Sequence, residues 1–163
     1  MNQELTLSYH LKVNGVDREV CGADYTETLL HVLRYRLGLT ATKEACEDGQ
    51  CGSCTVLIDG QPVNSCIELA AEAQGTAIMT IEGYNRPGGE LTPLQKSLVK
   101  HAAVQCGYCI PGLILAAEAF LKENPGATES QIRSGMDGNL CRCTGYASIL
   151  AAISEAAKES HAS

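Results

Sequence analysis

Three cysteines lie close together in the segment Cys46-Glu47-Asp48-Gly49-Gln50-Cys51-Gly52-Ser53-Cys54, and Cys66 follows twelve residues after the last of them. The spacing C-x4-C-x2-C, with a more distant fourth cysteine, is the plant-type pattern for a 2Fe-2S cluster. The glycines at positions 49 and 52 let the backbone approach a small inorganic core, so that N–H groups can point at its sulfur atoms. A zinc site or a disulfide is the alternative, but structural zinc sites usually pair their cysteines as two C-x2-4-C motifs. The segment therefore predicts an iron–sulfur loop.

The cysteine content extends this prediction to a second site. The chain has nine cysteines in 163 residues, which is too many for an ordinary reduced enzyme. In a reducing compartment, groups of cysteines indicate metal sites rather than disulfides. Eight of them form two groups of four, namely Cys46, Cys51, Cys54 and Cys66, and then Cys106, Cys109, Cys141 and Cys143. We expect the ninth, Cys21, to be a small buried residue in a strand.

The composition argues against several classes of function. Twelve basic and nineteen acidic residues give a net charge of −7, which disfavours nucleic-acid binding. The first residues lack the features of a secretory signal, and no segment approaches about 18 uninterrupted apolar residues, so we expect no membrane contact and a cytoplasmic location. Dinucleotide, phosphate-loop and G-x-S-x-G motifs are absent, and the four histidines are scattered. We therefore predict no catalytic residue and no substrate site on this chain.

The first half of the sequence predicts a small sheet with one helix. Apolar residues alternate along the first strand, and Asn14-Gly15 then supplies a tight hairpin turn. Thr26 is a candidate N-cap for a helix that Gly38 would end. The order of elements resembles the β-grasp of plant-type ferredoxins, and we assign residues 1–81 to this domain. The expected elements are strands at residues 5–13, 16–20, 55–58, 61–65 and 78–81, and a helix at 26–37.

The second half predicts a helical domain, so that the whole chain is of the α+β class. A turn-rich segment at residues 82–91 is the expected linker, and residues 92–163 are expected to form a four-helix bundle. Thr92 and Thr128 each open a capping box. The second group of cysteines falls at two helix junctions, where helix N-termini would help to hold an anionic cluster, although the spacing also permits zinc. The expected helices cover residues 92–104, 110–122, 128 onward and 146–158.

Both cysteine groups together resemble a known family. The segment Gln105-Cys-Gly-Tyr-Cys109 is followed by Gly138-Asn-Leu-Cys-Arg-Cys-Thr-Gly-Tyr146, behind the plant-type loop. This arrangement covers nearly the whole chain and resembles the small iron–sulfur subunit of the molybdenum hydroxylases, the xanthine dehydrogenase, aldehyde oxidoreductase and carbon monoxide dehydrogenase family. The resemblance implies an electron-transfer subunit with two 2Fe-2S clusters. Its partners would be a large molybdopterin-binding subunit and a medium FAD-binding subunit, assembled as a dimer of heterotrimers.

The resemblance also implies roles for individual residues. The second group of cysteines would hold the cluster nearer the molybdopterin, with the Gln105 side chain approaching the pterin and Cys143 at the hydrogen-bonding contact with it. The first group would hold the cluster nearer the flavin, and electrons would pass from molybdenum through both clusters to FAD. The sequence departs from the family at Ile110, where Thr is usual, and at Ala45, where Gly is commoner. Neither position is a ligand.

Two rival hypotheses remain open at this stage, a freestanding two-cluster carrier or redox sensor and a non-redox zinc scaffold. Arg142 lies between two candidate ligands and would either offset cluster charge or only pair with a surface carboxylate. We expect Tyr108 and Tyr146 to pack around a cluster, and Lys43 and Glu44 to belong to a solvated face.

Overall fold

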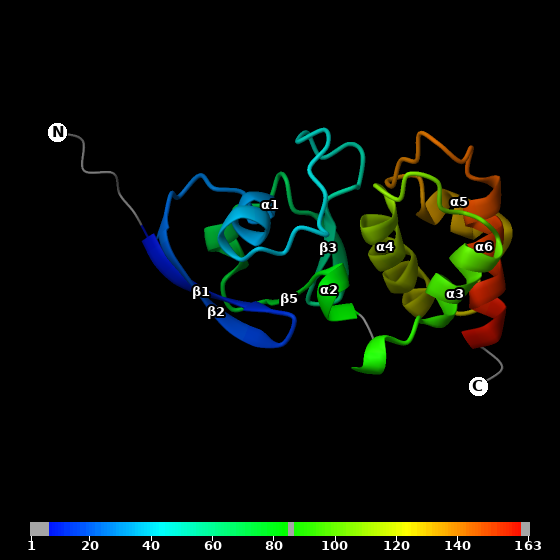
Figure 1. Cartoon of the computed structure of the whole chain (residues 1–163), viewed down its shortest axis with the longest axis horizontal. Coiled ribbons are helices and arrows are strands. Elements are labelled where there is room, and N and C mark those ends of the chain that lie inside the picture. Colours follow the sequence, from blue (N-terminus) through cyan, green and yellow to red (C-terminus); the bar gives the residue numbers. More distant parts are fainter. Residues whose placement is uncertain (1–6, 85–86, 161–163) are drawn as a thin grey trace.

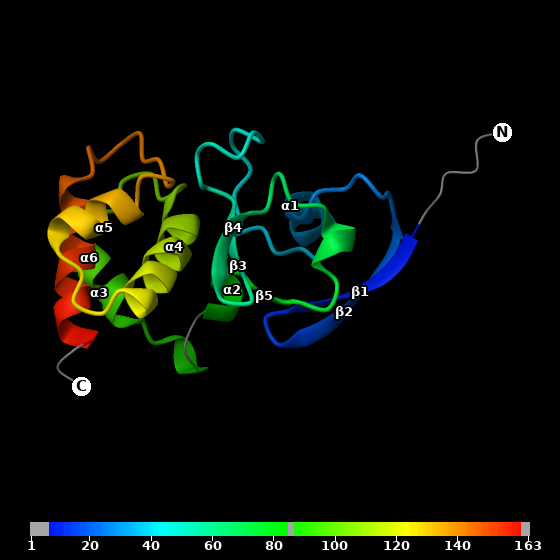
Figure 2. The same ribbon diagram turned by 180° about the vertical axis from the view of Figure 1, so that it is seen from behind.

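The computed structural model describes residues 7–84 and 87–160. These residues form a sheet-containing half and a helical half that lie side by side (Figure 1). The view from behind in Figure 2 shows the same arrangement, with helix α4 next to strand β3 at the boundary between the halves. Among the helices of the described ranges, none has the length and apolar character needed to span a bilayer.

The sheet is mixed and has five strands within the described residues, in the order β2-β1-β5-β3-β4. Strand β1 pairs antiparallel with β2 and parallel with β5, and β3 pairs antiparallel with β5 and β4. Asn14 and Gly15 have φ angles of 54° and 77°, which confirms the predicted hairpin turn. Residues 5 and 6 of the first predicted strand lie outside the described ranges. The strands are β1 (Leu7–Val13), β2 (Val16–Ala23), β3 (Thr55–Ile58), β4 (Gln61–Asn64) and β5 (Ala77–Met79), the last ending two residues earlier than predicted.

The helix of the first half changes from α-helical to π-helical geometry along its length. Helix α1 (Leu29–His31) runs directly into η1 (Val32–Arg36), a π-helical turn that the sequence did not predict. The N-cap is Thr28, whose hydroxyl accepts a backbone N–H at 3.2 Å. The prediction of Thr26 as the cap was wrong, because its hydroxyl donates instead to the Asp24 carboxylate at 2.6 Å. The apolar side of this helix is fully buried against the sheet.

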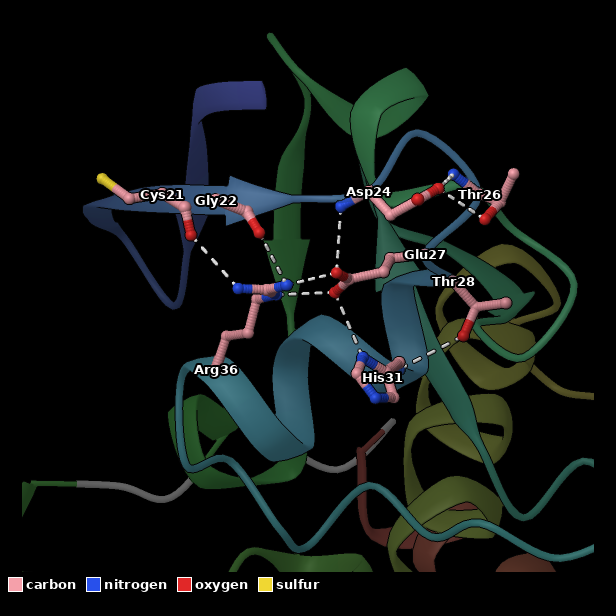
Figure 3. A network of polar contacts seen from close by, with 8 residues as sticks. All are labelled: Cys21, Gly22, Asp24, Thr26, Glu27, Thr28, His31 and Arg36. Carbon is pink, nitrogen blue, oxygen red and sulfur yellow. Dashed lines mark hydrogen bonds and ion pairs between the residues drawn. The ribbon is translucent and has the colours of Figure 1, made fainter. Parts of the chain in front are cut away.

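A polar network ties the end of η1 to strand β2 (Figure 3). The Arg36 guanidinium donates to the carbonyl oxygens of Cys21 at 3.1 Å and Gly22 at 3.0 Å. It also pairs with the Glu27 carboxylate, which His31 contacts at 3.1 Å from the other side. The hydrogen bond from Arg36 is the main reason why the pKa of Glu27 falls to about 2.

Cys21 does not have the environment that we predicted. It lies in a strand as expected, but its side chain is exposed. Its neighbour Val20 faces the core, and successive side chains of a strand point to opposite faces. Its partner in β1, Ser8, is exposed, as are His10 and Lys12, so the face that Cys21 shares is open to solvent.

The helical half has its own core. In this part of the described chain, the capping boxes predicted at Thr92 and Thr128 are both present. The first helix ends at Lys100 rather than at residue 104. The core includes Leu98, Leu113, Ile149 and Ile153. The helices are α3 (Pro93–Lys100), α4 (Ile110–Glu123), α5 (Glu129–Gly135) and α6 (Ala147–Ser160).

Short helical turns lie in the connections between the longer helices and strands. The 3-10 turn η2 (Ala70–Ala73) precedes β5, and η3 (Pro87–Gly89) precedes α3. The start of the expected turn-rich linker belongs to a short helix, because α2 (Ile81–Tyr84) packs its two apolar ends against the boundary between the halves. Residues 85 and 86 of that segment lie outside the described ranges.

The two halves are in direct contact along α4 and β3. Leu57 of β3 packs with Leu115 and Ala119 of α4 in a small buried cluster. At the start of α4, Gly112 approaches the backbone so closely that a Cβ atom there would lie 2.4 Å from the carbonyl oxygen of Gly52. This close approach places the loop that ends at β3 against the N-terminal turn of α4.

Candidate functional site

The first group of cysteines lies at the boundary between the halves. Cys46, Cys51 and Cys54 belong to the loop before β3, and Cys66 follows β4. The loop appears in cyan at the upper side of the molecule in Figure 1, on the same side as the orange loop between α5 and α6. Cys46 is exposed and Cys51 is half-buried, whereas Cys54 and Cys66 are buried.

The backbone of this loop is shaped to turn its amides inward. Glu47, Gly49 and Gly52 have φ angles of 55°, 68° and 67°, in the left-handed region that favours glycine. Backbone N–H groups, first that of Asp48, donate to the Cys46 sulfur and lower its pKa to about 7. The loop therefore offers amide donors to a negatively charged sulfur, as the sequence predicted.

The four thiols of the first group are arranged in two pairs. The Cys46 side chain contacts that of Cys51, and the Cys54 side chain contacts that of Cys66. Burial raises the pKa of Cys54 to about 12, so that its proton stays in place at neutral pH until a metal displaces it. The pair Cys46 and Cys51 therefore lies near the surface, and the pair Cys54 and Cys66 is buried.

The second group shows the same pairing. Cys106 and Cys109 lie between α3 and α4, and Cys141 and Cys143 lie between α5 and α6, as predicted. The sulfur atoms of Cys106 and Cys143 are 3.6 Å apart and both residues are exposed. Cys109 contacts Cys141, and both are half-buried. Burial, with a smaller contribution from this contact, raises the pKa of Cys109 to about 12.

The paired thiols fit two iron–sulfur clusters. All nine cysteines of the chain are free thiols. A 2Fe-2S cluster takes four thiolates, two for each iron, which is the arrangement of each group here. In residues 7–84 and 87–160, no three His, Cys, Asp or Glu side chains converge on the position of a single metal ion.

Hydrogen bonds join the two groups across the boundary. The N–H of Leu140, which precedes the candidate ligand in the second group, donates to the carbonyl oxygen of Cys51 at 2.9 Å. The buried Asn139 amide donates to the carbonyl oxygen of Gly52 at 3.0 Å and to the Thr55 hydroxyl at 3.2 Å. Sequence reasoning missed these residues, because the partners are more than 80 positions apart along the chain.

The residues expected near a pterin lie on the exposed side of the second group. The Gln105 side chain is exposed, and its Nε2 donates to the carbonyl oxygen of Cys143 at 3.2 Å. Arg142 is also exposed on this side. The structure thus brings Gln105 and Cys143 together at the surface.

Two other expectations near the clusters are modified. Glu44 and Lys43 are half-buried rather than part of a fully solvated face, and the Glu44 carbonyl accepts a hydrogen bond from the Tyr108 hydroxyl. Tyr108 therefore links the two halves. Tyr146 packs beside the second group as expected, and its hydroxyl accepts the N–H of Cys141 at 2.8 Å.

The two departures from the family pattern have simple structural settings. Ile110 is the first residue of α4 and packs, half-buried, against the helical core. Ala45 is absent from the residues with a positive φ, so alanine suits the backbone at that position.

Comparison with known proteins identifies both halves. Residues 11–79 match the model of a 2Fe-2S iron-sulfur cluster binding domain, and residues 80–154 match that of a second 2Fe-2S binding domain. The chain is 44% identical over 147 residues to the nicotinate dehydrogenase small FeS subunit of Eubacterium barkeri, covering 90% of this chain and 92% of that protein. It is 42% identical over 161 residues to the xanthine dehydrogenase iron-sulfur-binding subunit of Escherichia coli O157:H7, covering 97% and 99%.

The chain belongs to the family of small iron–sulfur subunits of the molybdenum hydroxylases. The solved structure of quinoline 2-oxidoreductase from Pseudomonas putida 86 contains a similar chain, with a TM-score of 0.90 and 42% identity over 96% of this chain and 97% of that one. This iron–sulfur subunit carries two 2Fe-2S binding domains and is a subunit of an oxidoreductase with an electron-transfer role. Its relatives are named as subunits, which disfavours the freestanding carrier.

Proposed function

We propose that this chain carries electrons from the molybdopterin site of a large subunit, through two 2Fe-2S clusters, to FAD in a medium subunit during substrate oxidation or hydroxylation. The observation that carries this proposal is the backbone hydrogen bond from the N–H of Leu140, the residue before Cys141, to the carbonyl oxygen of Cys51. When bound, each cluster would supply one-electron redox chemistry. The chain's own contribution is to hold the clusters and connect them.

The eight grouped cysteines are the proposed ligands. The matches to two 2Fe-2S binding domains favour two irons at each site over a single zinc ion. The glycine-rich loop of the first site adds amide donors that would offset the negative charge of the cluster. The ligands are Cys46, Cys51, Cys54 and Cys66 for the first cluster, and Cys106, Cys109, Cys141 and Cys143 for the second.

The path inside the chain is short because the two sites share backbone contacts. Cys51 belongs to the first proposed ligand set, and Cys141 directly follows Leu140. A single hydrogen bond of 2.9 Å therefore connects the backbone segments of the two proposed ligands. The buried Asn139 amide and the close approach of Gly112 hold this contact in place.

The exposed pair of each site would face a partner. Gln105 and Cys143 lie together at the surface and form the proposed contact with molybdopterin in the large subunit. Cys46, exposed at the other site, marks the proposed side of the FAD-binding subunit. An assembly as a dimer of heterotrimers and a cytoplasmic location complete the proposal, which the sequence supports.

We keep the predicted domain assignment as part of the proposal. It comprises a β-grasp ferredoxin-like domain at residues 1–81, a linker at 82–91 and a four-helix bundle at 92–163. The mixed sheet with its helix and the separate helical core support this division.

An affinity tag on this chain in its own host tests the proposal. We expect molybdenum and FAD to co-purify with two further chains and with about four irons per copy of this chain. The control is the same purification from cells that produce the untagged chain. Iron without a partner chain, molybdenum or flavin would overturn the proposal in favour of a freestanding carrier.

A further inference from the structure

The second site contains a side-chain hydroxyl directed at a cysteine sulfur. The Oγ1 atom of Thr144 lies 3.2 Å from the Sγ atom of Cys141, within the 4.0 Å range of hydrogen bonds to sulfur, and both residues are half-buried. The same Oγ1 atom accepts the backbone N–H of Tyr146 at 3.3 Å. A hydroxyl can accept one hydrogen bond and donate another, so this oxygen accepts the N–H and donates its proton to the sulfur.

The backbone holds the hydroxyl in this position. Gly145 and Tyr146 have φ angles of 65° and 69°, so that two consecutive left-handed residues fold the chain back over Cys141. The Tyr146 hydroxyl then accepts the N–H of Cys141 at 2.8 Å. Three hydrogen bonds therefore close a compact loop in which Thr144 has one clear partner for its proton.

Backbone N–H groups donate to a cysteine sulfur at both sites, those of Cys143 and Thr144 to Cys141 at the second, but only Cys141 also has the Thr144 hydroxyl as a donor. The sulfur of Cys46 accepts hydrogen bonds from the backbone N–H groups of Asp48, Gln50 and Cys51. These backbone donors remain when a side chain is replaced. At the second site, one oxygen atom can be deleted by mutation while the backbone is retained. The contribution of this donor can therefore be measured separately.

We propose that the Thr144 hydroxyl raises the reduction potential of the second cluster through its hydrogen bond to Cys141. Reduction adds one electron to a cluster that is already anionic, and a hydrogen bond to a ligand sulfur stabilises the added charge. The electron comes from the molybdenum side and leaves to the first cluster, so a higher potential favours its uptake at the second site. Thr144 acts through a ligand and is a tuning residue. The inference rests on the proposed function, because Cys141 must be a cluster ligand.

Redox titration of the intact complex, followed by EPR, tests the proposal. At the midpoint potential of the wild type, T144V should lower the ratio of reduced to oxidised second cluster about tenfold, the usual weight of a hydrogen bond to a charged group. A tenfold change corresponds to about 59 mV for a one-electron couple. The signal of the first cluster serves as an internal control and should not shift.

Further variants make the result decisive. T144S keeps the hydroxyl and should retain the wild-type potential. T144A also removes the hydroxyl and is too small to clash, so it replaces T144V if T144V fails to assemble, and it should show the same shift in potential. T26V removes a hydroxyl that donates to the Asp24 carboxylate rather than to a cysteine, and it should change neither potential. An unchanged second potential in T144V or T144A, or a T144S shift equal to theirs, would overturn the inference. A wild-type complex without a second 2Fe-2S signal would instead refute the ligand role of Cys141, and this inference with it.

Discussion

Substituting Gly112 with alanine tests the contact that holds the two sites together. Gly112 is buried in the first turn of α4 and faces the loop of the first site. A Cβ atom there would lie 2.4 Å from the carbonyl oxygen of Gly52 and 3.2 Å from that of Ser53. Both neighbours are backbone atoms, so they cannot rotate away from the added methyl group.

The expected magnitude follows from two opposing effects. Ordinary contact begins at 3.4 Å, so α4 and the loop must separate by about 1 Å to admit the methyl group. Such overpacking costs about 3 kcal/mol when the neighbour is rigid. Alanine in a helix is favoured over glycine by about 1 kcal/mol, which offsets part of the cost. The net loss of about 2 kcal/mol should lower Tm by about 4–8 °C for a chain of this size.

Thermal unfolding of the cluster-loaded complex, followed by the bleaching of visible absorbance, measures this effect. Gly138 provides a matched control, because its φ is not positive and no atom lies within 4 Å of the position that a Cβ atom would take there. We expect G138A to melt within about 1–2 °C of the wild type, as surface substitutions usually do. If G112A melted at or above the wild-type temperature, helix propensity alone would govern the site and the close-contact argument would be refuted.

Three other predictions concern the ion pair, the interface and the ligands. Because Arg36 lowers the pKa of Glu27 to about 2, the pair stabilises the fold above pH 4.5 and is lost as pH falls towards 2. E27Q should therefore lower the free energy of unfolding by about 1–2 kcal/mol at pH 7, allowing for solvent screening. The difference in Tm between E27Q and the wild type should shrink below pH 4.5, and a constant difference would argue against the pair. N139A should lower the free energy of chemical unfolding by about 1–3 kcal/mol, because it removes two buried hydrogen bonds, and a neutral result would contradict this. C51S should abolish one 2Fe-2S EPR signal and leave the other, whereas loss of both would count against independent sites.

Local features of the fold were predictable from local sequence. The hairpin at Asn14-Gly15 and the capping boxes at Thr92 and Thr128 depend on residues within a few positions of each other, and all three are confirmed. The choice between Thr26 and Thr28 as N-cap was not predictable in this way. It depends on whether Asp24 captures the first hydroxyl, which is a matter of loop geometry.

The positions of the cysteines relative to the helices were also predictable, but the connection between the two sites was not. The contact of Gly112 with Gly52 and the hydrogen bond of Leu140 to Cys51 join segments that are far apart in the sequence. No periodicity or capping pattern encodes such pairs, because they arise from packing of the two halves. Cys21 was misplaced for a related reason, since the cysteine alone does not show which face of the sheet the rest of the chain covers.

Iron quantification together with EPR of the dithionite-reduced native complex tests the central claim most directly. Two 2Fe-2S clusters held by the two groups of paired thiols predict about four irons per copy of this chain and two separable signals of equal intensity. One signal with about two irons, or stoichiometric zinc in place of iron at either site, would contradict the account.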